Sequence, residues 1–320
     1  MKRCKTLIAA IWVLISWWDI YGLHHIPYAS FDISMGASAD QKSPQKYEGR
    51  YQFLNAFKWL YARNNFTRVV PQARIKIPKI IHHIWLGSQF PTAYETYYRS
   101  WKEHHPEWCS VFWTDNPINF SKGERVVGSF DELSALLGTE QSVKRLVVDV
   151  RTVSFTNRIY FDQATNYGEK SDILRYEILY NVGGLYVDTD FESLQPCDLL
   201  HHMYDLYVGI QPLDTGYGQL GIGLVGAIVG HPLMKLAIEN IKNSCAEKQI
   251  ICRTGPFYFT RLFCHYMKNG LTIDVALPAS YFYPMGYDQQ RLSSDIWQKK
   301  ESFAVHHWAG SWLPTHATIG

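Results

Sequence analysis

The residues of this chain whose types and spacing most clearly predict chemistry lie at positions 183–190, which read GGLYVDTD. Two carboxylates, Asp188 and Asp190, stand two positions apart at the end of a short apolar segment. In an extended segment such residues project to the same face, so both could hold one hard divalent cation. Mg²⁺ or Mn²⁺ bound in this way keeps open positions, which substrate phosphates fill. The spacing therefore predicts a metal site for a nucleotide diphosphate.

The residues before this run predict the helix that positions it. Residues 171–181 have helical apolar spacing, with Ser171 as a suitable N-cap and Asp172 in the first turn. The glycine pair then stops the helix. Asp172 and Arg175 are three positions apart on one helix face, and such a pair in isolation is typical of a weak surface ion pair. An isolated Asp-x-Asp is common in surface loops, so the specificity comes from the whole block.

This block, residues 171–190, resembles the DXD sugar-binding region of glycosyltransferase family 32. Members include fungal initiating mannosyltransferases, inositol-phosphoceramide mannosyltransferases and α-1,4-galactosyltransferases. Residues 77–87 (IPKIIHHIWLG) resemble the family's first strand, and residues 304–312 (AVHHWAGSW) resemble its C-terminal motif. The resemblance implies an α/β fold of the GT-A type, which is Rossmann-like, with a mainly parallel sheet and helices on both faces.

The resemblance also implies a role for each matching residue. The implied donor-binding residues are Trp85, Asp172, Arg175, Tyr186, Ser311 and Trp312; the implied metal ligands are Asp188, Asp190 and His306; and the implied catalytic residues are Asp188, Asp190 and Arg175. The residue types suit these roles, because an indole stacks on a nucleobase and a guanidinium matches phosphate or carboxylate. Whether His306 or His307 faces the metal stays open, since neighbours in an extended segment point to opposite sides.

The implied activity is metal-dependent transfer of a hexose, with retention of configuration and with Mn²⁺ or Mg²⁺ as cofactor. The donor would be GDP-mannose or a UDP-hexose, with mannose favoured, and the acceptor a lipid or a glycan. One alternative is a non-catalytic sugar-binding protein on the same fold. Another is a phosphatase with an aspartyl nucleophile, which requires Thr or Val where this chain has Glu192.

Composition sets broader bounds. The chain has 320 residues, of which 47% are hydrophobic, enough for one sizeable α/β domain. A formal charge of +2 argues against a nucleic-acid partner. The six cysteines include no C-x-x-C pair, which argues against a structural zinc site. Cys245, Cys252 and Cys264 are close enough in sequence for one disulfide, although free thiols fit equally well.

The N-terminus predicts a membrane segment. Residues 7–18 are mostly apolar, and Lys2, Arg3 and Lys5 precede them, with no further Lys or Arg before Lys42. This asymmetry favours a cytoplasmic N-terminus and a single-pass type II protein. The apolar run is short for a full span and also resembles the core of a signal peptide. A Golgi lumenal enzyme is favoured, and an enzyme on the cytoplasmic face of a bacterial inner membrane is the alternative.

We accordingly expect a membrane anchor at 1–23, a stem at 24–70 with a short helix at 51–65, and a catalytic domain at 71–320. Within that domain, the apolar patterns predict alternating strands and helices. The expected strands are 79–86, 111–115, 146–150 and 221–229, and the expected helices are 94–105, 131–137, 231–244 and 257–268. Ligands of such sheets lie at the carboxyl ends of strands, where the acidic pair falls.

Overall fold

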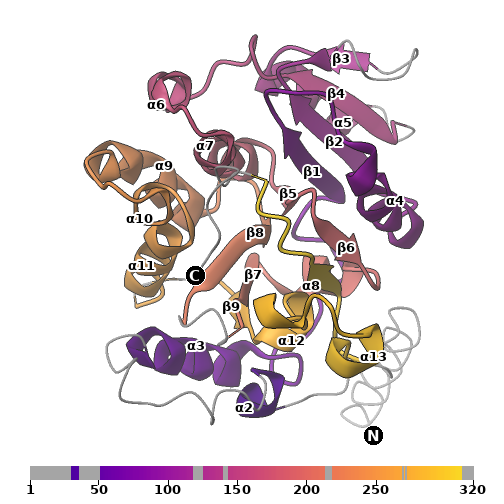
Figure 1. Cartoon of the computed structure of the whole chain (residues 1–320), viewed down its shortest axis with the longest axis vertical. Coiled ribbons are helices and arrows are strands. Elements are labelled where there is room, and N and C mark those ends of the chain that lie inside the picture. The colour runs from indigo at the N-terminus through magenta and orange to yellow at the C-terminus, as the bar shows by residue number, and fades with distance from the viewer. Residues whose placement is uncertain are drawn as a thin grey trace, which may run out of the picture.

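The computed structural model of this chain describes residues 30–35, 51–117, 125–139, 143–212, 218–268, 270 and 272–311 (Figure 1). The expected membrane anchor at 1–23 and the predicted donor-binding residue Trp312 lie outside these ranges. Within them, none of the helices has both the length and the apolar character that a membrane crossing requires.

One large sheet organises the molecule. In spatial order its strands are β3 (Arg125–Val127), β4 (Arg145–Asp149), β2 (Cys109–Thr114), β1 (Ile80–Trp85), β5 (Gly184–Val187), β8 (Leu220–Ala227), β7 (Leu206–Ile210) and β9 (Asp274–Leu277). All neighbouring strands are parallel except at β8, which runs antiparallel to both β5 and β7. The mainly parallel α/β sheet expected from the sequence is therefore confirmed.

Helices cover both faces of this sheet. The helices of the described residues are α2 (Phe31–Ser34), α3 (Tyr51–Asn64), α4 (Glu95–His104), α5 (Phe130–Thr139), α6 (Arg158–Gln163), α7 (Tyr167–Asn181), α8 (Asp198–Met203), α9 (Pro232–Ser244), α10 (Ile250–Arg253), α11 (Pro256–Tyr266), α12 (Ala279–Phe282) and α13 (Ser294–Trp297). Tyr98 of α4 packs on His83, with ring centroids 5.1 Å apart, and Phe130 of α5 packs on Trp113 at 5.5 Å. Trp113 also contacts His82, so α4 and α5 lie on opposite faces.

A second, two-stranded sheet joins the C-terminal segment to the region after β5. Strands β6 (Phe191–Ser193) and β10 (Ala304–His306) pair antiparallel, with His306 opposite Phe191. Since β6 begins directly after Asp190, this pairing places the C-terminal motif beside the acidic pair.

Helix α7 differs from its prediction at the N-terminus. It begins at Tyr167, and the N-cap is Asn166, whose side chain accepts hydrogen bonds from the backbone N–H groups of Gly168 and Glu169. The prediction of Ser171 as N-cap is therefore wrong, because Asn166 caps the helix more than a turn earlier. Asp172 consequently lies inside the helix and not in its first turn.

The described part of the expected stem packs against the rest of the protein. In α3, Phe57 and Tyr61 are buried, and the Tyr61 hydroxyl lies 2.9 Å from that of Tyr281. Phe57 packs edge-on against Phe263 of α11. The part of the predicted stem that α3 forms is thus integrated into the hydrophobic core. Cys245, Cys252 and Cys264 are free thiols, which resolves the alternatives left open by their spacing.

Candidate active site

The acidic pair leaves the sheet at the carboxyl end of β5. Gly183 and Gly184 have φ values of 67° and 97°, in the left-handed region that favours glycine, and they connect α7 to β5. A Cβ at Gly184 would lie 2.7 Å from the Ile80 carbonyl oxygen, so this close approach of β5 to β1 also requires glycine. The glycine pair thus determines where the chain enters β5.

The geometry of the pair corrects one expectation. Strand β5 ends at Val187, and the Phe191 N–H donates to the Asp188 carbonyl, so residues 188–191 form a turn. Asp188 and Asp190 therefore converge through a turn and not through the alternation of an extended strand, because the chain must reverse here to enter β6.

Three potential metal ligands meet at this turn. One side-chain atom from each of Asp188, Asp190 and His306 lies within 4.8 Å of the others. His306 Nε2 is 3.2 Å from Asp190 Oδ2, and its Nδ1 is buried with no hydrogen-bond partner among the described residues. Two carboxylates and an imidazole form a donor set that suits Mn²⁺. We call these three residues the metal group.

His306, and not its neighbour, belongs to this group. The His307 ring stacks on Tyr97 with centroids 4.1 Å apart, and its Nε2 lies 2.9 Å from Glu192 Oε2. The two imidazoles thus point to different partners, as expected for neighbours in an extended segment. The position of Asp190 is fixed by the His307 N–H, which donates to its carbonyl, and by the Ala309 N–H, which donates to its Oδ2 at 2.9 Å.

Asp190 is set up to carry a negative charge. Burial alone would raise its pKa, but electrostatic attraction to His306, a hydrogen bond with His306 and the Ala309 N–H act against this, and the net shift of the pKa is downward. The carboxylate form is therefore maintained near neutral pH, as metal binding requires.

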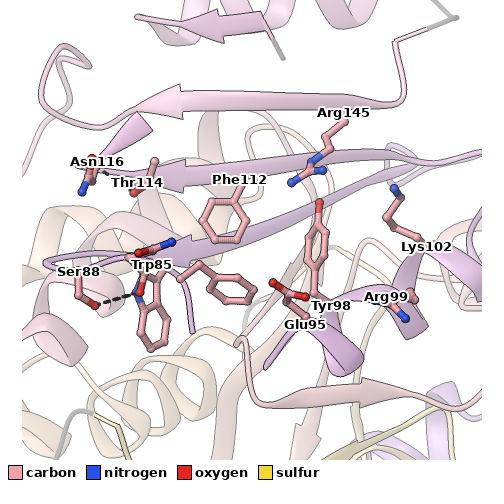
Figure 2. A pocket seen from close by; sticks show the side chains of 12 residues that line it. Trp85, Ser88, Glu95, Tyr98, Arg99, Lys102, Phe112, Thr114, Asn116 and Arg145 are labelled. Carbon is pink, nitrogen blue, oxygen red and sulfur yellow. Dashed lines mark hydrogen bonds between the residues drawn. The ribbon is translucent and has the colours of Figure 1, made fainter. Parts of the chain in front are cut away.

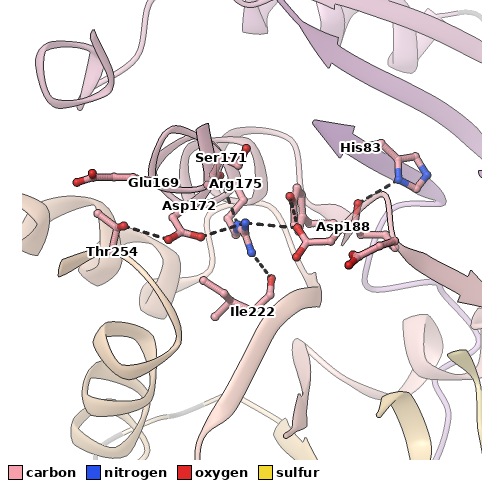
Figure 3. A network of polar contacts seen from close by, with 12 residues as sticks. His83, Glu169, Ser171, Asp172, Arg175, Asp188, Ile222 and Thr254 are labelled. Carbon is pink, nitrogen blue, oxygen red and sulfur yellow. Dashed lines mark hydrogen bonds and ion pairs between the residues drawn. The ribbon is translucent and has the colours of Figure 1, made fainter. Parts of the chain in front are cut away.

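Arg175 connects helix α7 to the metal group (Figure 3). Its Nη2 lies 3.0 Å from Asp172 Oδ1 and 3.4 Å from Asp188 Oδ1, and its Nη1 donates to the Ile222 carbonyl at 2.7 Å. The side chains of Arg175 and Asp172 are only 5% and 10% exposed. This is not the weak surface pair that the isolated spacing suggests, because both side chains are buried and hydrogen-bonded.

Asp172 has a second partner. The Thr254 hydroxyl donates a hydrogen bond to Asp172 Oδ2 at 3.0 Å. This bond connects the turn before α11 to the pair of Asp172 and Arg175. Burial raises the pKa of Asp172 to about 7, and the neighbouring Arg175 only partly offsets that rise.

Tyr186 supports the metal group from within the sheet. It is buried, and its hydroxyl donates to Asp188 Oδ1 at 2.6 Å. The Arg175 guanidinium carbon lies 4.5 Å from the centroid of its ring. The structure thus brings Tyr186, Arg175 and Asp172 together with the acidic pair. Direct contact between Tyr186 and the sugar donor remains a prediction.

Trp85 lies at one end of a groove on the α4 side of the sheet (Figure 2). Its indole N–H donates to Ser88, and its ring lies 5.4 Å from that of Tyr94. The groove has a volume of about 370 Å³, and three cationic side chains outnumber the one acidic side chain in its lining. The lining combines the aromatic side chains Trp85, Phe90, Tyr98 and Phe112 with the cationic side chains Arg99, Lys102 and Arg145 and the acidic side chain Glu95. A planar, negatively charged ligand fits such a lining.

Tyr94 links this groove to the metal group. Burial and the Asp190 charge raise the pKa of Tyr94, while a hydrogen bond with Ser311 lowers it. Ser311, an implied donor-binding residue, is exposed and forms a hydrogen bond with Tyr94, whose ring contacts Trp85 of the groove. Tyr94 and Tyr97 were not singled out from the sequence. Tyr94 is the N-cap residue of α4 and Tyr97 lies in its first turn, and their spacing of three positions indicates only that they share one side of the helix.

Comparison with known proteins shows which proteins this chain is similar to. The family described as "Glycosyltransferase sugar-binding region containing DXD motif" matches residues 91–206. Inositol phosphoceramide mannosyltransferase 2 of Schizosaccharomyces pombe is 24% identical over 250 residues, which cover 76% of this chain and 60% of that protein. Human alpha-1,4-N-acetylglucosaminyltransferase is 27% identical over 226 residues, which cover 64% of this chain and 63% of that protein.

A solved structure, "PaToxG Glycosyltransferase", aligns with a TM-score of 0.44 and 21% identity, over 70% of this chain and 79% of the other. The chain spans between 53% and 60% of the length of three inositol phosphoceramide mannosyltransferases of S. pombe. The matched region contains the acidic pair and the helix before it, so this part of the chain is similar to glycosyltransferases whose sugar-binding region contains a DXD motif, in agreement with the resemblance to family 32.

Proposed function

We propose that this protein is a divalent-metal-dependent glycosyltransferase that moves a hexose from a nucleotide-sugar donor to a lipid or glycan acceptor. The observation that carries the proposal is the convergence of Asp188, Asp190 and His306 within 4.8 Å at the carboxyl end of β5. This is the end of an α/β sheet where ligands bind.

Each residue of the site has a separate role in this proposal. Asp188, Asp190 and His306 would hold Mn²⁺ or Mg²⁺, which supplies charge stabilisation for a departing diphosphate. Arg175 holds the Asp188 carboxylate in place and adds a fixed positive charge on the same side of the site. Because its other contacts are to Asp172 and to the Ile222 carbonyl, its position needs no reorganisation during the reaction.

The donor would extend from the metal group towards the groove. Its nucleobase would stack on Trp85 and its diphosphate would lie near Ser311 and Tyr94. The names of the S. pombe relatives favour mannose, while the human relative indicates that an N-acetylhexosamine donor also occurs among similar proteins. We therefore propose GDP-mannose first and a UDP-hexose second, with retention of configuration and without a covalent intermediate.

We further propose that residues 1–23 anchor the protein in a membrane as a single-pass type II protein, with the catalytic part in the Golgi lumen. The apolar run at 7–18 and the cations before it support this proposal. A position on the cytoplasmic face of a bacterial inner membrane is the alternative. Protease protection of the full chain in microsomes distinguishes a lumenal from a cytoplasmic catalytic part.

A donor screen tests the proposed activity. Purified protein is incubated with GDP-mannose, UDP-galactose, UDP-glucose or UDP-N-acetylglucosamine, with Mn²⁺ or with EDTA, and release of the nucleoside diphosphate is measured. We expect one donor to be hydrolysed, and only in the presence of metal. Glycan binding without metal and without hydrolysis of any donor would instead identify a sugar-binding protein.

A further inference from the structure

Two neighbouring histidines of β1 contact the two ends of β5. His82 Nε2 lies 2.9 Å from the Gly183 carbonyl oxygen, and His83 Nδ1 lies 3.0 Å from the Val187 carbonyl oxygen. Both imidazoles are almost completely buried. Because successive side chains of a strand alternate, the two rings reach β5 from opposite faces of the sheet.

The hydrogen bonds indicate the tautomer of each ring. The Trp113 indole N–H donates to His82 Nδ1 at 3.2 Å, so the His82 proton is on Nε2, from which it is donated to Gly183. His83 must carry its proton on Nδ1 to donate to Val187. Burial lowers the pKa of His82 to about 4 and that of His83 to about 3, so both rings are neutral near pH 7.

The hydrogen bonds from His82 and His83 add to a short backbone pairing between β1 and β5. Strands β1 and β5 are in register at only two residue pairs, Ile81 with Leu185 and His82 with Tyr186. The two carbonyls lie just outside this stretch, one before β5 and one at its last residue. Buried carbonyls need a donor, and the imidazoles supply one where this pairing stops.

The two ends of β5 differ in their distance from the metal group. Val187 directly precedes Asp188, so its carbonyl fixes the plane of the peptide bond that leads into the turn. Gly183 lies at the opposite end of the strand, beside α7. Figure 3 shows His83 approaching the β5 end that carries Asp188, on the side opposite Arg175.

We propose that His83 is a positioning residue for the metal group: its Nδ1–H holds the Val187 carbonyl and thereby sets the direction in which Asp188 leaves β5. His82 makes a bond of the same kind at the other end of the strand and supports the fold without setting the metal group. This inference rests on the proposed metal-dependent function.

The test compares His83→Leu with the matched variant His82→Leu. Each substitution removes one buried donor to a β5 carbonyl and introduces an apolar side chain. We expect both to lower the urea midpoint of unfolding, while only His83→Leu weakens Mn²⁺ binding, by about ten-fold, since loss of a group that orients metal ligands typically costs 10–100-fold in affinity. Mn²⁺ affinity is measured by electron paramagnetic resonance below the unfolding transition of every variant.

His83→Asn supplies a second comparison, because its amide N–H can take the place of Nδ1–H. It should restore Mn²⁺ affinity to within about three-fold of the unmodified protein. The inference is overturned if the two leucine variants lose equal Mn²⁺ affinity, or if His83→Asn is as impaired as His83→Leu. Failure of the unmodified protein to bind Mn²⁺ or to turn over any donor would instead refute the proposed function itself.

Discussion

The close contact between β8 and the metal group leads to a specific prediction for Gly223. This glycine lies opposite the point where β5 ends, and its carbonyl accepts the Asp188 N–H at 2.7 Å. A Cβ at position 223 would lie 2.6 Å from Asp188 Oδ2 and 2.8 Å from Phe191 Cε2. Gly223→Ala therefore adds one methyl group directly against the carboxylate that would bind the metal.

The size of the effect follows from these distances. Ordinary van der Waals contact begins at 3.4 Å, so the carboxylate must move by about 0.8 Å if the backbone stays in place. The side chains of a binding site must be held within about 0.5 Å of the productive geometry, and a displacement of about 1 Å can lower the rate by about 10²-fold. We therefore expect kcat/KM for metal-dependent donor hydrolysis to fall by about 10²-fold.

The assay measures donor hydrolysis over a range of Mn²⁺ concentrations, together with the thermal midpoint. Gly138→Ala is the matched control, because Gly138 is in α5 and a Cβ there would meet nothing within 4 Å. This control should keep full activity and gain slightly in stability, by about 0.4–1 kcal/mol. A folded Gly223→Ala protein whose activity is within about three-fold of the unmodified protein would refute the reasoning.

Three further predictions concern stability, the arginine and the groove. Four buried histidines have lowered pKa values, of about 4 for His82, about 3 for His83, about 4 for His105 and about 3 for His201. The unfolded chain protonates these histidines more readily than the folded protein does, so the free energy of unfolding is highest above pH 6.5 and falls as the pH is lowered, by about 2 kcal/mol per histidine at pH 5. Urea unfolding at pH 7.5 and pH 5 checks this prediction. Equal urea midpoints at the two pH values would contradict it. Arg175→Lys keeps the positive charge but loses the contacts that the planar guanidinium makes to Asp172 and Ile222. We therefore expect kcat/KM to fall by about 10²-fold while the fold is retained. Near-normal turnover of this variant would argue against the proposed role of Arg175. Trp85→Ala should raise the KM for the donor by about ten-fold or more, as expected for the loss of one stacking contact, and an unchanged KM would place the base elsewhere.

Local patterns predict the elements of this fold well. Strands β1, β2, β4 and β8 and helices α4, α5, α9 and α11 all occur where the apolar spacing predicts them. The error at the start of α7 has a simple cause. Asn166 and Ser171 are both good N-cap residues, and a helix that begins after Asn166 includes Glu169, which pairs with the distant Arg253.

The site is less predictable because its geometry depends on long-range contacts. The acidic pair is visible in the sequence, but the turn at residues 188–191 depends on the pairing of β6 with β10. The same pairing decides that His306 joins the metal group while His307 contacts Glu192. The bond from His83 to Val187 joins positions 104 residues apart, and no local pattern indicates it.

Removal of one carboxylate at a time tests the central claim most directly. Donor hydrolysis is measured in saturating Mn²⁺ for the unmodified protein, Asp188→Asn and Asp190→Asn, with Mn²⁺ affinity measured in parallel. If the two side chains hold the cation together, each variant binds Mn²⁺ weakly and turnover is abolished in both. Near-normal turnover in both folded variants would contradict the account.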